Sequence, residues 1–324
     1  MGDALPHPAW VKKQVLRAAV DVHRMVKCLN AISDNRYPKL AERYQAVSDE
    51  LAKRLEGVSG TAPSSWVMDL SETRAEHAWL VGGKMANLGE LRNAVGLPTP
   101  PGFTVTAEAY QSMIRAHGFL PDEAGNPPAT ENGLPEEGGM TIPETIEMSI
   151  LDAYDRLSQD LGAPPAVAVR SSAIGEDSAY SFTGQFLTLL NVRREGLIEA
   201  YRKVVESLFS AEAVHYRQLH KLAASTMPVG FLVMAEAVAS GVVYTADPSR
   251  PEDRVVLVHV VKGLGPSLVD GRTSPETITV ERDPELHIGH RRASFQTSIV
   301  ISTPDGGVRD EPLPQELAAA PCLS

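Results

Sequence analysis

The hydrophobic pattern of the chain changes character after its first 65 residues. Apolar residues recur every three or four positions over residues 10–31 and again over residues 40–55, a spacing that predicts two helices. A short polar turn separates them, so residues 1–65 are expected to form an N-terminal helical hairpin with a role in packing or subunit contact. Residues 60–65, Gly-Thr-Ala-Pro-Ser-Ser, have the composition of a linker.

Beyond the linker, short β-branched runs alternate with helical patterns. The runs predict strands at 103–106, 166–169 and 255–258, and the helical spacing recurs near 84–94, 107–117, 145–160 and 195–222. This alternation predicts an α+β or α/β fold for residues 66–324. Residues 120–144 are rich in Pro, Gly and Glu and are expected to form a long exposed loop.

Charge and cysteine content narrow the class of protein. The 324 residues carry 30 Lys and Arg against 41 Asp and Glu, a formal charge of 30 − 41 = −11. This acidic excess argues against nucleic-acid and anionic-membrane partners, but it allows a local basic pocket. The two cysteines, Cys28 and Cys322, form no CxxC pair, which favours a reducing compartment. Because the sequence shows no apolar signal core and no membrane span, a cytoplasmic protein is expected.

Residues 81–91, VGGKMANLGEL, combine two glycines with a lysine at a predicted helix start. Gly82 and Gly83 allow the backbone to approach a ligand closely, and Lys84 adds an ammonium group beside the free amides of the helix. This combination suits a phosphate. The alternative is a simple turn with a solvated lysine, and the segment does not match the P-loop pattern.

Residues 166–185, AVAVRSSAIGEDSAYSFTGQ, place Arg170 at the end of a predicted buried strand, before a loop of small and hydroxyl residues. A guanidinium can bind two phosphate oxygens, and small residues let backbone N–H groups close over the others. Such a loop could act as a mobile lid. The alternative is a surface ion pair of Arg170 with Glu176 or Asp177.

Residues 229–236, VGFLVMAE, form a third segment of interest. A strand of Phe, Leu, Val and Met side chains could wall an adenine, with backbone groups at its end reading the edge of the base. Core packing is the alternative for each apolar side chain. Asp247, which precedes a proline, is expected to form a turn.

Taken in order, these segments resemble the N-terminal ATP-binding domain of the phosphoenolpyruvate synthase and pyruvate phosphate dikinase family. The matching stretches are GGKMANLGEL, GLPTPPGFTVTAEAY, VAVRSSAIGEDSAYSFTGQF, MPVGFLVMAEAVASGVVYTADP and GLGPSLVDGRTSPE. The resemblance covers about residues 66–324 and leaves the N-terminal hairpin outside. It implies an ATP-grasp-like fold of two α+β lobes that hold ATP between them.

The resemblance also implies an ATP-dependent, kinase- or dikinase-type phosphotransferase and assigns roles to residues. Lys84 is expected to contact the ATP phosphates and Arg170 the transferred end, as the catalytic pair. The other implied nucleotide contacts are Ser171, Ser172, Gly184, Gln185, Phe231, Leu232, Val233, Met234 and Glu236. In the family, the phosphate passes to a histidine on a swivelling domain and then to pyruvate or another acceptor on a third domain.

Three positions depart from the family pattern. Pro266 follows Gly-Leu-Gly where the family has a glutamate that resembles a Mg²⁺ ligand. His259 replaces a polar or acidic residue in the preceding strand, and Leu232 replaces a frequent glutamine. Because Mg²⁺ prefers oxygen ligands, its carboxylates would have to come from elsewhere. The candidates are Asp270, Glu276 and Asp247.

These departures leave two interpretations open. The chain is either a phosphotransferase module or a catalytically degenerate, nucleotide-binding or regulatory module of the same family. None of its nine histidines has the glycine-rich setting of the family's phosphohistidine. The phosphohistidine and acceptor domains are therefore expected on a longer chain or another subunit, so that this segment alone is incomplete as an enzyme. A homo-oligomer remains open.

Overall fold

The computed structural model of the chain describes residues 36–56, 65–116, 139–174, 187–210, 226–250, 252–282 and 285–323, together with single positions between 15 and 33 and at 213 and 215. The chain divides into two compact units, residues 1–65 and 66–324. Most of the predicted loop at 120–144 lies outside the described residues, as do Gly184 and Gln185.

In the first unit, helix α2 (Pro38–Glu56) covers the second predicted helix. The described positions from Val15 to Asn30 are also helical. The turn between them is closed by the Tyr37 amide, which donates to Asn30 Oδ1 at 3.1 Å. Several apolar side chains of the unit are nevertheless more than a third exposed: Val22, Met25, Leu29, Tyr37, Leu40 and Val47.

The second unit is built around a five-stranded sheet in the order β1-β2-β5-β3-β4, in which every neighbouring pair is antiparallel. Its strands are β1 (Val67–Asp69), β2 (Gly102–Val105), β3 (Val167–Ser171), β4 (Thr188–Val192) and β5 (Val229–Val233). Its helices are α3 (Ala78–Glu90), α4 (Ala107–Ala116), α5 (Glu144–Leu161) and α6 (Leu197–Glu206). Short 3-10 or π turns flank them at Ala75–His77, Leu91–Val95, Arg194–Gly196 and Ser207–Phe209.

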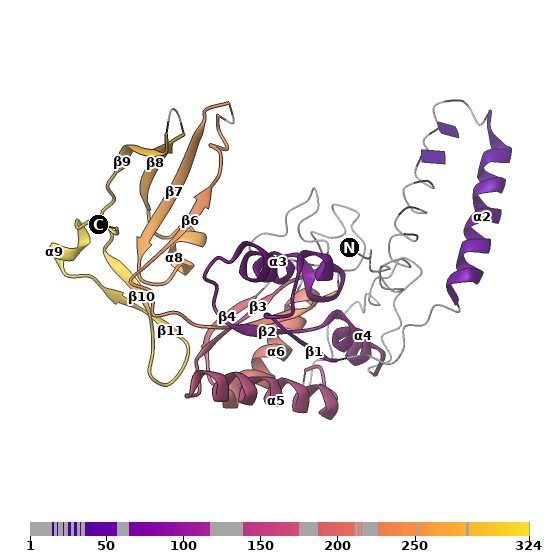
Figure 1. Cartoon of the computed structure of the whole chain (residues 1–324), viewed down its shortest axis with the longest axis horizontal. Helices are drawn as coiled ribbons and strands as arrows, with labels where there is room; N and C mark the ends of the chain where they lie inside the picture. Colours follow the sequence, from indigo (N-terminus) through magenta and orange to yellow (C-terminus); the bar gives the residue numbers. More distant parts are fainter. Residues whose placement is uncertain are drawn as a thin grey trace. The chain divides into compact units, whose positions relative to one another are not determined.

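Helices cover both faces of this sheet (Figure 1). Strand side chains alternate between the faces. Phe103, Val169 and Phe231 therefore share one face and pack with α4, α5 and α6 in the larger core. Leu232 points to the other face and packs under α3 in a smaller core. The five-stranded sheet is therefore a platform with apolar contacts on both sides.

The C-terminal part forms a second, four-stranded antiparallel sheet in the order β6-β7-β8-β9 (Figure 1). Its strands are β6 (Ala239–Tyr244), β7 (Val255–Lys262), β8 (Glu276–Glu281) and β9 (His287–Arg292). A separate hairpin pairs β10 (Ser298–Ser302) with β11 (Val308–Pro312), and the short helices are α8 (Pro266–Val269) and α9 (Gln315–Ala318). All residues of β9 are exposed.

Antiparallel sheets with helices packed on them fit the α+β class predicted from the sequence. The boundaries differ in two places. Helix α3 begins at Ala78, ahead of the predicted 84–94, because the chain is helical both before and after a break at Gly82. Helix α6 ends at Glu206, well before residue 222. Within the described ranges, no helix is long and apolar enough to cross a bilayer.

Candidate nucleotide-binding site

The site begins at the break in helix α3. Gly82 has φ 76° and ψ 162°, a backbone conformation that is essentially restricted to glycine. A Cβ atom at this position would lie 1.6 Å from the carbonyl oxygen of Ser172. The glycine therefore serves two needs: it redirects the chain, and it lets the helix approach the end of β3. Lys84 follows in the first turn after the break.

Ser172 holds this helix start in place. The Met85 amide donates to Ser172 Oγ at 3.2 Å, and the Ser172 amide donates to the Pro228 carbonyl at 3.0 Å. The side chains of Ser171 and Ser172 are both buried. The family resemblance predicts that these two residues contact the nucleotide as part of the phosphate lid. In this structure the Ser172 hydroxyl is enclosed between α3 and β3 and accepts the Met85 amide, and its contact with the nucleotide stays a prediction.

Arg170 lies on the sheet face that carries α3. In the strand register, Arg170 pairs with Gly230, which pairs with Thr104. The side chain of Met85 packs directly on Gly230, where a Cβ atom would meet Met85 Sδ at 2.4 Å. The segments that carry Lys84 and Arg170 are thus brought to one region of the platform, and both residues are partly exposed.

The predicted adenine wall divides between core and surface. Phe231 is fully buried and stacks on Phe103 with ring centroids 4.8 Å apart. Leu232 is buried beneath α3. Both side chains are enclosed by core neighbours on opposite faces of β5, which favours the core-packing alternative, and their contact with adenine stays a prediction.

The end of β5 is more accessible. Val233 is partly buried against the larger core, and its amide donates to Pro101 O at 2.9 Å. The Met234 amide donates to Ala166 O at 2.9 Å. The Met234 side chain is partly exposed and Glu236 is exposed. Of the predicted strand, Met234 and Glu236 therefore keep the exposure that a ligand contact requires.

Glu276, one of the three candidate metal ligands, is occupied by other contacts. Its carboxylate is 2% exposed, forms an ion pair with Arg291, and accepts the Cys322 amide at Oε2 over 2.6 Å. Burial raises the pKa of this carboxyl, but hydrogen bonds from Arg291 and Cys322 lower it more, so that the pKa lies below its ordinary value. The carboxylate fastens the C-terminal segment to the second sheet.

Asp270, a second candidate ligand, is exposed and lies 3.4 Å from the Arg272 guanidinium. Asp247 forms the expected turn, in which its Oδ1 accepts the Ser249 amide at 2.8 Å. Among the residues that the structure describes, no group of three or more His, Cys, Asp or Glu could hold a metal ion. The described carboxylates therefore do not fit a protein-built Mg²⁺ site, and no step of the chemistry is assigned to one.

Two of the three substituted family positions, Pro266 and His259, have structural roles on the second sheet and at α8. Pro266 is the first residue of α8, where its fixed φ favours the helix and its missing N–H costs nothing. His259 packs edge-on against Tyr244 on the second sheet, with ring centroids 5.4 Å apart.

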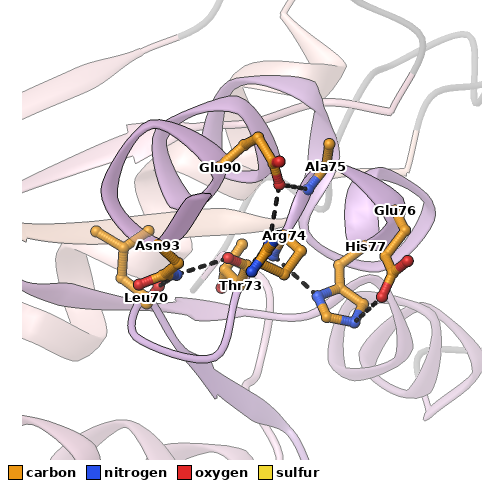
Figure 2. Close-up of polar contacts among 8 residues, drawn as sticks. All are labelled: Leu70, Thr73, Arg74, Ala75, Glu76, His77, Glu90 and Asn93. Atoms are coloured by element: carbon orange, nitrogen blue, oxygen red, sulfur yellow. Dashed lines mark hydrogen bonds and ion pairs between the residues drawn. The ribbon is translucent and has the colours of Figure 1, made fainter. Parts of the chain in front are cut away.

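A polar network joins the turn before α3 to the end of that helix and to the turn after it (Figure 2). No sequence motif predicted this network. Glu90 Oε2 accepts Arg74 Nε at 3.1 Å and the Ala75 amide at 3.0 Å. These two hydrogen bonds hold the pKa of the Glu90 carboxyl below its ordinary value, and the bond from the Ala75 amide has the larger effect. Asn93 Nδ2 donates to the carbonyls of Leu70 and Thr73, each at 2.8 Å.

This network ties the turn that enters α3 to the end of the same helix, and it thereby supports the segment around Lys84. Its partners lie 15 to 23 residues apart. Contacts between residues so far apart do not produce the spacing of three or four residues that marks a helix or the alternation that marks a strand. The sequence therefore offers no local signal for this network.

Comparison with known proteins decides the family. The model of the pyruvate phosphate dikinase AMP/ATP-binding domain matches residues 78–125 and 138–324. The chain belongs to this family. The match begins at the first residue of α3 and includes the segments that carry Lys84, Arg170 and the end of β5. It leaves out the N-terminal unit and the residues up to His77, which include part of the polar network before α3.

Curated relatives agree with this membership. A probable phosphoenolpyruvate synthase of Methanothermobacter thermautotrophicus is 32% identical over 80% of this chain and 40% of its own length. A rifampicin phosphotransferase of Bacillus cereus is 33% identical over 68% of this chain and 27% of its own length. The phosphoenolpyruvate synthase of Aeropyrum pernix is 33% identical over 74% of this chain and 31% of its own length. The chain thus spans two fifths or less of the length of these relatives.

Proposed function

We propose that residues 66–324 form an ATP-grasp-like module that binds ATP between the platform and the second sheet. In this proposal Lys84 contacts the phosphates and Arg170 contacts the end that is transferred. The observation that carries the proposal is the junction of α3 and β3. There Gly82 approaches Ser172, Met85 packs on Gly230, and the two cationic residues come to the same side of the sheet.

The local chemistry supports a phosphate ligand. The chain restarts a helix immediately after Gly82, and the first backbone N–H groups of a helix favour an anion. An ammonium and a guanidinium beside them add the positive charge that phosphoryl transfer requires. ATP, when bound, supplies the phosphoryl group. The residues of this chain bind the phosphates, orient them and neutralise their charge.

The proposal extends to a histidine that receives the phosphate on another domain of a longer chain or on another subunit. The names of the relatives suggest the class of final acceptor: a three-carbon keto acid for the synthases and an antibiotic hydroxyl for the rifampicin enzymes. That choice would be made by domains outside residues 66–324. The identity of the acceptor therefore rests on the relatives, because nothing in the site selects it.

A second function is favoured by the metal region: a module that binds nucleotide without turnover. Pro266 offers no side-chain oxygen, and both Glu276 oxygens are engaged by Arg291 and Cys322. Such a module would sense or sequester the nucleotide. In both proposals Lys84 and Arg170 contact the nucleotide. The two differ in whether a phosphoryl group is then transferred.

Calorimetric titration with ATP, with and without Mg²⁺, tests the binding site. Lys84→Ala and Arg170→Ala are each expected to weaken ATP binding by about tenfold to a hundredfold, because each removes one charge-assisted phosphate contact. Lys203→Ala on α6 and Arg156→Ala on α5 are the matched controls, since both lie on helices of the opposite face. Equal affinity in all four variants and the wild type would contradict the assignment.

Product analysis separates the two functions. The wild-type chain is incubated with ATP, Mg²⁺ and the isolated phosphohistidine domain of a phosphoenolpyruvate synthase. Formation of AMP and a phosphorylated histidine supports the phosphotransferase. ATP binding without either product, with Mg²⁺ or Mn²⁺, supports the nucleotide-binding module.

A further inference from the structure

Asn191, at the edge of the platform, has an unusual backbone. It is the single non-glycine residue in the described ranges with a positive φ, 55°, and it is 1% exposed. Asparagine tolerates this left-handed conformation better than most residues, but the conformation still costs free energy. A buried residue keeps such a backbone only where its surroundings hold it there.

The surroundings of Asn191 are the turn of the β10–β11 hairpin, more than 110 residues further along the chain. Asn191 Nδ2 donates to the carbonyls of Thr303 and Gly307, each at 2.7 Å. The Gly307 amide donates back to the Asn191 carbonyl at 3.0 Å. Gly306 and Gly307 both have positive φ, so this turn presents its carbonyls in a shape that requires glycine.

The middle of strand β10 in the same hairpin contacts the Gly-Leu-Gly segment that precedes Pro266. The Leu264 amide donates to Val300 O at 2.9 Å, and Gly263 bridges to Val300. A Cβ atom on Gly263 would lie 2.3 Å from the side chain of Ile299. The hairpin therefore links the edge strand of the platform to the segment that resembles the metal-binding part of the family.

We call the contact between Asn191 and the turn at residues 303–307 the joint. It is made by hydrogen bonds, and few apolar side chains pack around it. A cavity of about 370 Å³ opens beside it, lined by β4, α6 and the turn at Asp305–Gly307. On that side the turn does not press against a filled apolar core. The hydrogen bonds of Asn191 are thus the main described attachment of the turn to β4.

We propose that Asn191 is a positioning residue. It fastens the β10–β11 hairpin to the platform, and the hairpin in turn holds residues 263–265 at a set place relative to β3 and α3. The joint itself is independent of the proposed function. Only its consequence for ATP affinity rests on that function.

Hydrogen exchange of single backbone amides in the full chain tests the joint without any ligand. Asn191→Asp places a carboxylate oxygen against two carbonyls, and Asn191→Gly removes the side-chain bonds while relieving the backbone. In both variants the amides of Gly307 and Leu264 are expected to exchange about tenfold faster or more. The Phe231 amide in the platform keeps its wild-type rate. Asp310→Asn, which removes the exposed ion pair of the hairpin with Arg272, is the control and leaves all three rates unchanged.

Each outcome decides the proposal. Unchanged exchange at Leu264 in the Asn191 variants overturns it, because the hairpin then does not transmit the attachment. Faster exchange at Phe231 as well also overturns it, since Asn191 would then be a residue of general stability. ATP titration tests whether the joint affects the nucleotide site. Asn191→Gly is expected to weaken ATP binding about fivefold or more. Unchanged affinity refutes the effect on the nucleotide site. If the wild type fails to bind ATP, the proposed function fails while the exchange result still decides the joint.

Discussion

The two sheets of residues 66–324 differ in how they are held. The platform has helices on both faces, and the central strand β5 is buried from Val229 to Leu232. In the second sheet, the long strand β7 is fully buried only at Val260 and Val261. Besides its backbone ladders, polar contacts join the C-terminal part: Glu276 binds Arg291 and Cys322, and the β10–β11 hairpin binds Asn191 of the platform.

Because the platform and the second sheet are held differently, they can contribute differently to one binding site. A sheet packed on both faces is rigid, because any shift disturbs close-packed apolar contacts. A sheet held by a few hydrogen bonds can move without exposing a core. The cations of the candidate site are on the rigid half, while the segment around Pro266 is on the other half. Substitutions in the two halves test this contrast, and they are ordered by decreasing loss of stability.

The largest contrast is expected between two aromatic truncations. Phe231→Ala leaves a cavity in the platform core and should lower the free energy of unfolding by about 3–5 kcal/mol. Tyr244→Ala in β6 removes a 39% exposed ring that contacts His259, and should cost about 1 kcal/mol. Urea unfolding of both variants measures the difference. Equal losses would show that the second sheet is as tightly packed as the platform.

Gly82→Ala should cost about 3 kcal/mol, from backbone strain and from overlap with the Ser172 carbonyl. Gly96→Ala is the matched control, since Gly96 also has positive φ but has no atom within 4 Å of an added Cβ. The control should cost only about 1 kcal/mol, the strain alone. Thermal unfolding compares them. Equal costs would mean that α3 is not held tightly against β3.

Glu276→Gln tests the polar fastening of the second sheet. The substitution keeps the shape but removes the charge that Arg291 and the Cys322 amide recognise, and it should cost about 1–3 kcal/mol. Exchange of the Cys322 amide should rise, while the amides of β5 stay protected. Unchanged exchange at Cys322 would contradict the role assigned to this carboxylate.

The same carboxyl predicts a pH dependence. Its pKa in the folded protein lies below the ordinary value of 4.5, so its stabilisation is complete above the unfolded pKa and is lost as the pH falls through the folded pKa. Protection of Cys322 should therefore decrease below about pH 4.5 in the wild type. In Glu276→Gln this pH dependence should be absent. Measuring exchange from about pH 6 down to about pH 3 covers the window.

The smallest effect is expected at the entry to α3. Asn93→Ala removes two hydrogen bonds to the carbonyls of Leu70 and Thr73 and should cost about 1 kcal/mol. Asn87→Ala, at an exposed position of the same helix, is the control and should be neutral or slightly stabilising because alanine favours helices. Thermal unfolding distinguishes them. A larger loss at Asn87 would contradict the role of the network.

Local patterns in the sequence predicted much of the fold. The β-branched runs at 103–106, 166–169 and 255–258 correspond to β2, β3 and β7. The helical patterns correspond to α3, α4 and α5, and the first part of the pattern at 195–222 corresponds to α6. The ordered motifs indicated the family that the comparisons show. These features depend on residues that are neighbours in sequence, or on motifs that a reader can align, and no contact between distant segments is needed to recognise them.

Only the tertiary structure decided which side chains of those motifs are accessible. Phe231 and Met234 lie in one apolar stretch, yet Phe231 is core because it is paired inside the sheet with Phe103 and Val169. Met234 is partly exposed because it follows the end of β5. The tertiary structure also joins Glu276 to Arg291 and Cys322. The attachment of Asn191 joins segments more than 110 residues apart. Such pairings depend on how strands and turns meet in space, which the spacing of residues along the chain does not encode.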